Sequence, residues 1–234
     1  MLISIIIPVY NERENLIKRL SFLCKQANKF PIEIIVSNSP ETSDDSPKVC
    51  NNFDKVKFLQ SEKKGRAAQM NFGAKQAKGD ILLFLHADNQ LPEDFYTQVC
   101  TAVSKGNPFG FFAYKFDKDT FLLNVNSKFT KKDGFFAGGG DQCQFFTKEL
   151  FSNLNGFNEA FCIMEDFEII DRIRAKKIPY TIIQSKAIAS ARKYENNSWL
   201  KVNAINGYVF LLYKFGVKPE KLRKKYKSLL RESV

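Results

Sequence analysis

Short apolar runs that alternate with segments of helical periodicity constrain the fold of this chain more than any other feature. The apolar runs cover residues 3–10, 32–38, 55–61 and 80–88, and the clearest helical periods cover 12–27 and 65–79. A strand buried on both faces is a continuous apolar run, whereas a helix packed on a sheet has one apolar stripe. The alternation therefore predicts an α/β fold with a doubly wound, mostly parallel sheet flanked by helices.

The second half of the sequence is less regular, but its elements can still be assigned. The predicted elements are a strand over 110–116, a glycine-rich loop leading into a strand and a helix over 136–151, an amphipathic helix over 165–177, and one or two strands over 180–194. Two helices, separated at residues 216–219, are expected beyond Asn196. This division predicts one globular domain over residues 1–195 and a helical, basic tail over residues 196–234.

The net charge of +11 favours an anionic partner, such as a nucleic acid, a diphosphate-bearing substrate or an acidic membrane surface. Much of the excess lies in residues 218–231, and no nucleic-acid-binding motif occurs, so we expect no nucleic-acid partner. Five widely spaced cysteines without a CxxC pair favour a reducing, cytoplasmic location. The first apolar run ends at Pro8 and follows no basic segment, which predicts a strand rather than a signal peptide.

The carboxyl ends of the predicted strands are the first place to look for a ligand site, because ligands bind at this edge of open α/β sheets. Asp88 lies at the end of the fourth apolar run, and a carboxylate is a ligand that Mg²⁺ or Mn²⁺ prefers. The alternative is that Asp88 only begins the turn before residues 91–95. His86, the only histidine in the chain, could support this site or could be structural.

Glu165 and Asp166 begin the amphipathic helix over 165–177. Acidic residues favour the first turn of a helix because of the helix dipole, so a purely capping role is one interpretation. The other interpretation is a general base that removes a proton from an acceptor hydroxyl. The pair alone does not decide between the two.

Three further features are weak signals when each is taken alone. Residues 138–142 contain three glycines, which let backbone approach a ligand closely but are also typical of a mobile loop. The basic residues at 63–66 precede a helix N-terminus, and Arg192 with Lys193 could form a second anion site. No GxGxxG, GxxxxGK[ST], HExxH or GxSxG motif occurs, which argues against Rossmann dehydrogenases, P-loop NTPases, zincins and α/β-hydrolases.

Five stretches, taken in order, resemble the motifs of the family 2 glycosyltransferases with the GT-A fold. They are SIIIPVYNERENL, EIIVSNS, GRAAQMNFGAKQAKGDILLFLHADNQLP, GGGDQCQFFTKELFSNLNGFNE and MEDFEIIDRIR. With the ending SARKYENNSWLKVNAINGYVFLLYKFGVKPEKL, the chain is most similar to the bacterial radical-SAM/selenodomain-associated subgroup. The resemblance covers nearly the whole chain and implies transfer of a sugar from a nucleotide-sugar donor to an acceptor hydroxyl.

The resemblance also implies roles for individual residues. It places Pro8, Tyr10, Asn11 and Glu12 in the nucleotide pocket, Arg66 and Asn71 toward the donor, and Asp141 and Gln142 near the sugar and the acceptor. His86, Ala87 and Asp88 stand where many relatives have Asp-x-Asp, with Asp88 as the retained ligand of a divalent metal, and Asp166 matches the catalytic base. The implied mechanism is an inverting in-line displacement, in which Arg66 and Arg192 help the metal to stabilise the departing nucleoside diphosphate.

Two positions depart from the family pattern. His86 replaces the first Asp of Asp-x-Asp, which leaves the metal with fewer protein ligands. Asn38 replaces the Asp that usually contacts the nucleoside. Because an amide both donates and accepts hydrogen bonds, whereas a carboxylate only accepts, the preference for the base or the ribose is expected to differ.

Two other function classes stay open at this point. A nucleotidyltransferase would share the strand-end carboxylate, but it would normally carry a glycine-rich GxGTR-like loop, which residues 8–16 lack. A catalytically weak nucleotide-sugar-binding protein would keep the fold, although it would not need to retain both Asp88 and Asp166.

The tail predicts contact with a membrane surface. An apolar segment over 199–217, interrupted by polar residues and so not expected to span a bilayer, is followed by the strongly basic segment 218–231. This combination is typical of a peripheral anchor at the inner face of an anionic membrane, and it would suit a lipid-linked acceptor. Alternatively, the first tail helix packs on the main domain and leaves the second solvated.

Overall fold

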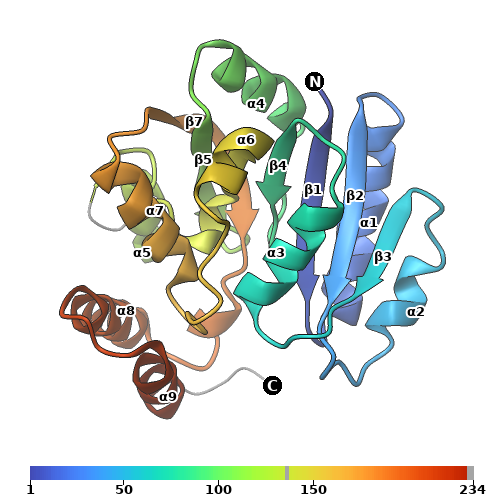
Figure 1. Ribbon diagram of the computed structural model, residues 1–234. Helices are drawn as coiled ribbons and strands as arrows, with labels where there is room; N and C mark the ends of the chain where they lie inside the picture. The colour runs from blue at the N-terminus through green and yellow to red at the C-terminus, as the bar shows by residue number, and fades with distance from the viewer. Residues whose placement is uncertain (135–136, 231–234) are drawn as a thin grey trace.

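The computed structural model describes residues 1–134 and 137–230 and contains one seven-stranded sheet with helices on both faces (Figure 1). The strands are β1 (Ile3–Val9), β2 (Ile32–Asn38), β3 (Val56–Gln60), β4 (Ile81–Phe84), β5 (Phe109–Phe116), β6 (Phe145–Thr147) and β7 (Tyr180–Ala189). Their order is β3-β2-β1-β4-β6-β5-β7, in which β6 runs antiparallel to both neighbours and the other pairs are parallel. The predicted doubly wound, mostly parallel sheet is confirmed.

The helices form one layer on each face of the sheet. One layer consists of α1 (Arg13–Ala27), α2 (Ser46–Cys50) and α4 (Phe95–Ser104), and the other of α3 (Arg66–Gln76), α6 (Lys148–Asn153) and α7 (Glu165–Ala175). Successive strand residues point to opposite faces, so Ile5 and Ile7 pack against the first layer and Ile6 packs against the second. Both faces of β1 are therefore buried, which explains why its sequence is apolar except for the buried Ser4.

The carboxyl ends of β1 and β2 are tied together by a buried side chain from α3. The amide nitrogen of Gln69 donates to the carbonyl oxygens of Val9 and Ser37, each at 2.8 Å. Four aromatic rings, Phe84, Phe146, Phe151 and Phe157, pack under the neighbouring edge with centroids 4.9 to 6.1 Å apart. The edge of the sheet that carries the candidate site is thus supported by the hydrogen bonds of Gln69 and by this cluster of aromatic rings.

The tail folds as two helices, α8 (Trp199–Lys214) and α9 (Pro219–Leu229), which pack against each other, and α8 also packs against α7. The Phe210 ring lies edge-on to Phe167 at 4.9 Å, and the Tyr213 hydroxyl donates to Asp171 at 2.6 Å. Within the described residues, no helix has the length and hydrophobicity that crossing a bilayer requires. The domain boundary at residue 195 stays a prediction, and Arg231, the end of the predicted basic segment, lies outside the described residues.

The structure differs from the sequence-based prediction in a few elements. The helices α2, α4 and α5 (Phe121–Phe129) were not predicted, since α2 is very short and α5 has only two buried residues, Leu123 and Ser127. The fourth strand ends at Phe84 instead of Asp88, because the chain turns where the Asn89 amide donates to the His86 carbonyl. Phe136, the start of the predicted glycine-rich loop, lies outside the described residues.

Candidate active site

The end of β1 and the loop that follows it place four predicted nucleotide-pocket residues at the carboxyl edge of the sheet. Pro8 is buried and pairs with Ser37 of β2, whereas Tyr10 is exposed. Asn11 has a positive φ of 53°, which is uncommon for a residue other than glycine, and its side-chain oxygen accepts from the amide of Ser43 at 2.8 Å. Asn11 therefore joins the loops that follow β1 and β2.

Asn38, at the end of β2, is buried at this edge. Its amide nitrogen donates to Gln60 at 3.0 Å and to the Ser39 carbonyl at 3.1 Å. Its side-chain oxygen is buried, and the described residues provide no hydrogen-bond partner for it. A buried acceptor left without a donor is costly, so this oxygen is suited to receive a hydrogen bond from a ligand.

Asp88 faces a cation supplied by the segment after β7. The Arg192 guanidinium lies 3.5 Å from an Asp88 carboxylate oxygen and 3.4 Å from a Glu12 carboxylate oxygen. Ala87 is buried, and its carbonyl accepts from Arg19 of α1 at 3.3 Å. The structure therefore brings together Glu12, Asp88 and Arg192, which lie far apart in the sequence.

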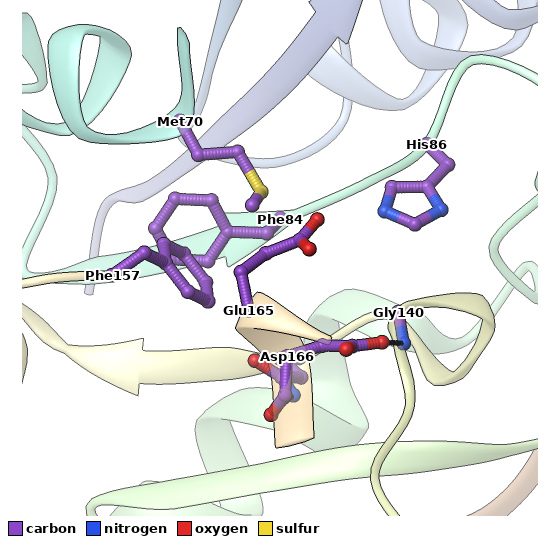
Figure 2. Close-up of a pocket in the computed structure, with 8 residues that line it drawn as sticks. Met70, Phe84, His86, Gly140, Phe157, Glu165 and Asp166 are labelled. Atoms are coloured by element: carbon purple, nitrogen blue, oxygen red, sulfur yellow. Dashed lines mark hydrogen bonds between the residues drawn. The ribbon is translucent and has the colours of Figure 1, made fainter. Parts of the chain in front are cut away.

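Asp166 lies in the first turn of α7. This helix begins after Met164, which caps it with a left-handed backbone conformation (φ 65°). One Asp166 carboxylate oxygen accepts from the Gly140 amide, the interaction drawn in Figure 2, and the other accepts from the Phe167 amide at 2.9 Å. Burial and the neighbouring Glu165 carboxylate raise the pKa of Asp166 to about 6, against the opposing effects of Arg66 and the Gly140 amide. A carboxylate with a pKa this close to neutrality is suited to exchange a proton at physiological pH.

Glu165, Arg66 and His86 form a chain of polar contacts beside a pocket that Glu165, His86 and Asp166 help to line. Glu165 is buried, and its carboxylate lies 3.3 Å from Nε of Arg66; Figure 2 shows it pointing into the pocket toward His86. Nη1 of Arg66 lies 3.3 Å from Nε2 of His86. Because Arg66 can only donate, this contact assigns Nε2 of His86 as the acceptor, so a neutral His86 carries its proton on Nδ1.

Asp141 lies between His86 and Lys193. Its two carboxylate oxygens are 3.9 Å from Nδ1 of His86 and 3.7 Å from Nζ of Lys193. Burial alone would raise the pKa of Asp141, but Lys193, His86 and Arg66 together lower it below its usual range. Asp141 therefore stays charged at neutral pH, where it forms an ion pair with Lys193.

Two other predicted residues have side chains that hold loops in place. Gln142 is buried, with its side-chain oxygen accepting from the Gly138 amide at 2.5 Å and its nitrogen donating to the Phe112 carbonyl at 3.1 Å. Asn71 accepts from the Phe157 amide at 2.9 Å and donates to its carbonyl at 2.8 Å. Any contact of these two residues with a donor or an acceptor stays a prediction.

Two supporting residues were missed by the sequence reasoning. Gln69 ties the ends of β1 and β2 as described above, and Gln144 donates to the carbonyls of Gly138 and Asp166 at 2.6 and 3.1 Å. Gln144 therefore fixes the glycine-rich loop relative to the start of α7. In the sequence, Gln69 and Gln144 are polar residues next to apolar positions, and this pattern does not reveal which backbone groups they bind.

Gly140 is packed so closely that a side chain would disturb the site. A Cβ at this position would lie 2.4 Å from Cε1 of His86 and 3.2 Å from an Asp166 carboxylate oxygen. We expect Gly140→Ala to lower turnover by about tenfold or more, because displacing a reacting group by about 1 Å is enough to cause such losses. Steady-state kinetics would measure this effect. Gly134→Ala, where a Cβ meets open space, is the matched control, and equal activity of the two variants would contradict the geometry.

A divalent metal fits this site only if its ligand set is shared with a substrate. Across residues 1–134 and 137–230, no three His, Cys, Asp or Glu side chains are grouped so that they could hold an ion by themselves. Asp88 offers a partly exposed carboxylate at the edge of the sheet. Mg²⁺ is often held by one or two carboxylates together with substrate phosphates and water, so Asp88 suits an ion bound jointly with a diphosphate.

Solved structures show the same fold. A mannosyltransferase from Pyrobaculum calidifontis, in complex with GDP-Man and Mn²⁺, superposes with a TM-score of 0.68 over 96% of this chain and 67% of that chain, at 17% identity. This likeness identifies the architecture of the present chain as a GT-A-type fold, followed by two C-terminal helices.

Sequence comparisons give the same assignment. Glycosyltransferase GlyG of Streptococcus pneumoniae is 27% identical over 73% of this chain and 57% of its own length. A GalNAc(5)-diNAcBac-PP-undecaprenol beta-1,3-glucosyltransferase of Campylobacter jejuni is 29% identical over 68% of this chain and 55% of its own. The chain thus spans little more than half the length of these two relatives. Residues 4–172 match the model of glycosyl transferase family 2, and the chain therefore belongs to this family.

Proposed function

We propose that this protein transfers a sugar from a nucleotide-sugar donor to an acceptor hydroxyl, with inversion at the anomeric carbon and with a divalent metal held at Asp88. The observation that carries the proposal is the convergence of Asp88, Arg66 and Asp166 on one edge of the sheet, where Asp166 has a raised pKa. Asp88 is thus available to hold a metal bound to the diphosphate, Arg66 to stabilise the negative charge of the leaving group, and Asp166 to accept the proton of the acceptor hydroxyl. The family membership and the fold support the same reaction class.

In the proposed reaction, the acceptor oxygen attacks the anomeric carbon of the donor from the face opposite the diphosphate. The bond from that oxygen to carbon forms while the bond from carbon to the phosphate oxygen breaks, and its electron pair leaves with the nucleoside diphosphate. Asp166 receives the proton of the acceptor hydroxyl. Arg66 and Arg192 stabilise the negative charge that develops on the diphosphate, and a bound Mg²⁺ or Mn²⁺ would neutralise the same charge.

The nucleoside is proposed to bind along the ends of β1 and β2. Pro8, Tyr10, Asn11 and Glu12 lie in or next to the first loop, and the buried side-chain oxygen of Asn38 is suited to accept a hydrogen bond from the base or the ribose. Asp141 and Gln142 are proposed to lie near the sugar and the acceptor, with Asp141 kept charged by Lys193.

Turnover should depend on pH through Asp166. Only the deprotonated carboxylate can accept a proton, and its pKa is raised to about 6, so activity is present above this pH and lost as the pH falls through it. We expect an acid limb in kcat that falls about tenfold for each pH unit below 6. Glu165→Gln should move this limb to lower pH, because it removes a charge that raises the pKa. A pH–rate profile from 4.5 to 9 measures both effects, and an unshifted limb in the variant would contradict the assignment.

The acceptor and the location in the cell are also proposals. The name of the Campylobacter relative describes an acceptor linked to undecaprenol diphosphate, and a lipid-linked acceptor would suit this chain because its tail is basic. We therefore propose a cytoplasmic protein that binds peripherally to anionic membranes through residues 199–231. Membership of the radical-SAM/selenodomain-associated subgroup is a further proposal, which rests on the sequence resemblance.

A screen of thermal stability tests donor binding without knowledge of the acceptor. UDP-, GDP- and dTDP-sugars are each added with and without Mn²⁺, because any ligand that binds only the folded state raises Tm. The proposal expects one nucleotide class to raise Tm in a Mn²⁺-dependent manner. A protein that responds to none of these sugars, in either condition, would contradict it.

A further inference from the structure

Large apolar side chains are exposed on two helices that lie side by side on one flank of the molecule. The four most exposed large apolar side chains of the described residues are Phe215 at 83%, Phe121 at 81%, Phe129 at 73% and Leu200 at 72%. Two belong to α5, one belongs to α8, and Phe215 directly follows α8. An exposed apolar patch of this kind marks a surface that contacts another apolar phase.

The exposed residues of α8 form a stripe opposite its buried face. Leu200, Ala204, Leu211 and Phe215 recur at spacings of four, seven and four residues, which places them on one side of a helix. The opposite side consists of Val202, Ile205 and Val209, all of which are buried. α8 is therefore apolar on two sides, and the interior of the protein covers only one of them.

α5 has the same organisation. Phe121, Val125 and Phe129 follow one another at intervals of four residues, and Leu122 lies next to them. The buried residues of this helix, Leu123 and Ser127, lie on the other side. The outward stripe of α5 is again apolar where a solvated helix would normally be polar.

Direct contacts join the two helices. The amide nitrogen of Asn126 on α5 donates to the side-chain oxygen of Asn203 on α8 at 3.0 Å. Leu123 and Trp199, from the same two helices, belong to one apolar cluster. Figure 1 shows α5 and α8 on the same flank as α7. Asn126 follows Leu122 by one helical turn, and Asn203 follows Leu200 by one turn. The two apolar stripes therefore lie next to the hydrogen bond between Asn126 and Asn203.

Basic residues outnumber acidic ones around this apolar surface. Residues 196–230 contain eight basic side chains and Glu220 as the only acidic one. Exposed lysines lie in or beside α5 at positions 118, 128, 131 and 132, together with the acidic residues Asp117, Asp119 and Asp133, of which Asp133 is paired with Arg174. Apolar side chains bordered by lysines match the chemistry of a bilayer with anionic headgroups, in which the rings enter the acyl boundary and the lysines stay at the phosphates.

We propose that the outward stripes of α5 and α8 form one docking face for an anionic lipid bilayer. Such docking rests on the proposed function, because it would bring the site to a lipid-linked acceptor. The contact is made by α5 and α8 rather than by the basic tail alone. α8 also packs on α7 through Phe210 and Phe167, so the docked surface is connected to the helix that carries Asp166. Docking would therefore orient the site relative to the membrane.

Cosedimentation with vesicles tests the proposal. The full chain is mixed with vesicles of phosphatidylcholine, or of phosphatidylcholine with phosphatidylglycerol, and the bound fraction is measured at low and high salt. The double variant Phe121→Ser/Phe129→Ser keeps every residue of the tail but should bind the anionic vesicles about tenfold more weakly or worse, because two rings no longer enter the membrane. Ile17→Ser, which removes an exposed apolar side chain of α1, is the matched control and should bind like the wild type.

The outcomes separate this proposal from its alternatives. Wild-type binding by the α5 variant, together with loss of binding when residues 218–234 are deleted, would assign the contact to the basic tail and overturn the proposal. Absence of wild-type binding to anionic vesicles would overturn it, as would a wild-type dimer in light scattering that the α5 variant abolishes. Release of nucleoside diphosphate in the absence of vesicles is measured separately, so a failure of the proposed reaction is distinguished from a failure of docking.

Discussion

Asp166→Asn is expected to lower kcat by about 10²–10⁴-fold, the range that general base catalysis contributes. The amide keeps the shape of the carboxylate and can still accept from the Gly140 amide, but it cannot take a proton. Because the proton moves only in the transition state, the affinity for the donor should stay unchanged. Release of nucleoside diphosphate measures kcat, and calorimetry measures donor affinity.

The control for this variant is Asp54→Asn, which makes the same chemical change at an exposed site next to β3, at the amino edge of the sheet. It should leave both quantities unchanged. Near-normal turnover of Asp166→Asn with the true acceptor would show that Asp166 only caps the helix. A loss of donor affinity equal to the loss of kcat would instead assign Asp166 to the donor site.

Asp88→Ala is expected to abolish metal-dependent binding of a nucleoside diphosphate. Asp88 supplies the carboxylate proposed to hold the metal. His86, which stands where many relatives have the first Asp of Asp-x-Asp, contacts Arg66 and Asp141 instead. The fold should survive, because Asp88 is partly exposed at the edge of the sheet and Arg192 keeps Glu12 as a partner. Titration calorimetry of the nucleoside diphosphate with and without Mn²⁺ measures the effect.

Asp54→Ala is the control and should retain Mn²⁺-dependent affinity. A melting temperature close to that of the wild type would confirm that Asp88→Ala is folded. If the variant bound the nucleoside diphosphate with unchanged Mn²⁺-dependent affinity, the metal would not be held at Asp88, and the residue would serve only in the turn that follows β4.

The parallel part of the fold could be predicted from the sequence because each strand carries its own evidence. β1 and β2 are mostly apolar runs, and the apolar stripe of α3 indicates the face that this helix buries. β6 has three residues and takes its direction from pairing with β4 and β5, which no local pattern encodes. α5 was missed because only two of its residues, Leu123 and Ser127, are buried, so the core constrains little of its sequence.

The candidate site could be predicted in composition but not in connectivity. The chain positions of Asp88 and Asp166, at a strand end and a helix start, identified them as candidates. The sequence did not show that both polar side-chain atoms of Asn71 hydrogen-bond to the Phe157 backbone, or that the buried Gln142 donates to the Phe112 carbonyl. These contacts join residues far apart in the chain, so only the folded structure reveals them. The pairing of Glu165 with Arg66, which affects the pKa of Asp166, was hidden for the same reason.

The products formed from a nucleotide sugar distinguish sugar transfer from nucleotidyl transfer. The wild type, Asp88→Ala and Asp166→Asn are incubated with UDP-, GDP- or dTDP-sugars and Mn²⁺, and phosphate-containing products are separated by anion exchange. We expect the wild type to release the nucleoside diphosphate from one donor class, a chelator to stop this release, and both variants to be impaired. Formation of a nucleoside triphosphate from the sugar nucleotide and added pyrophosphate, without release of the diphosphate, would contradict it and identify a nucleotidyltransferase.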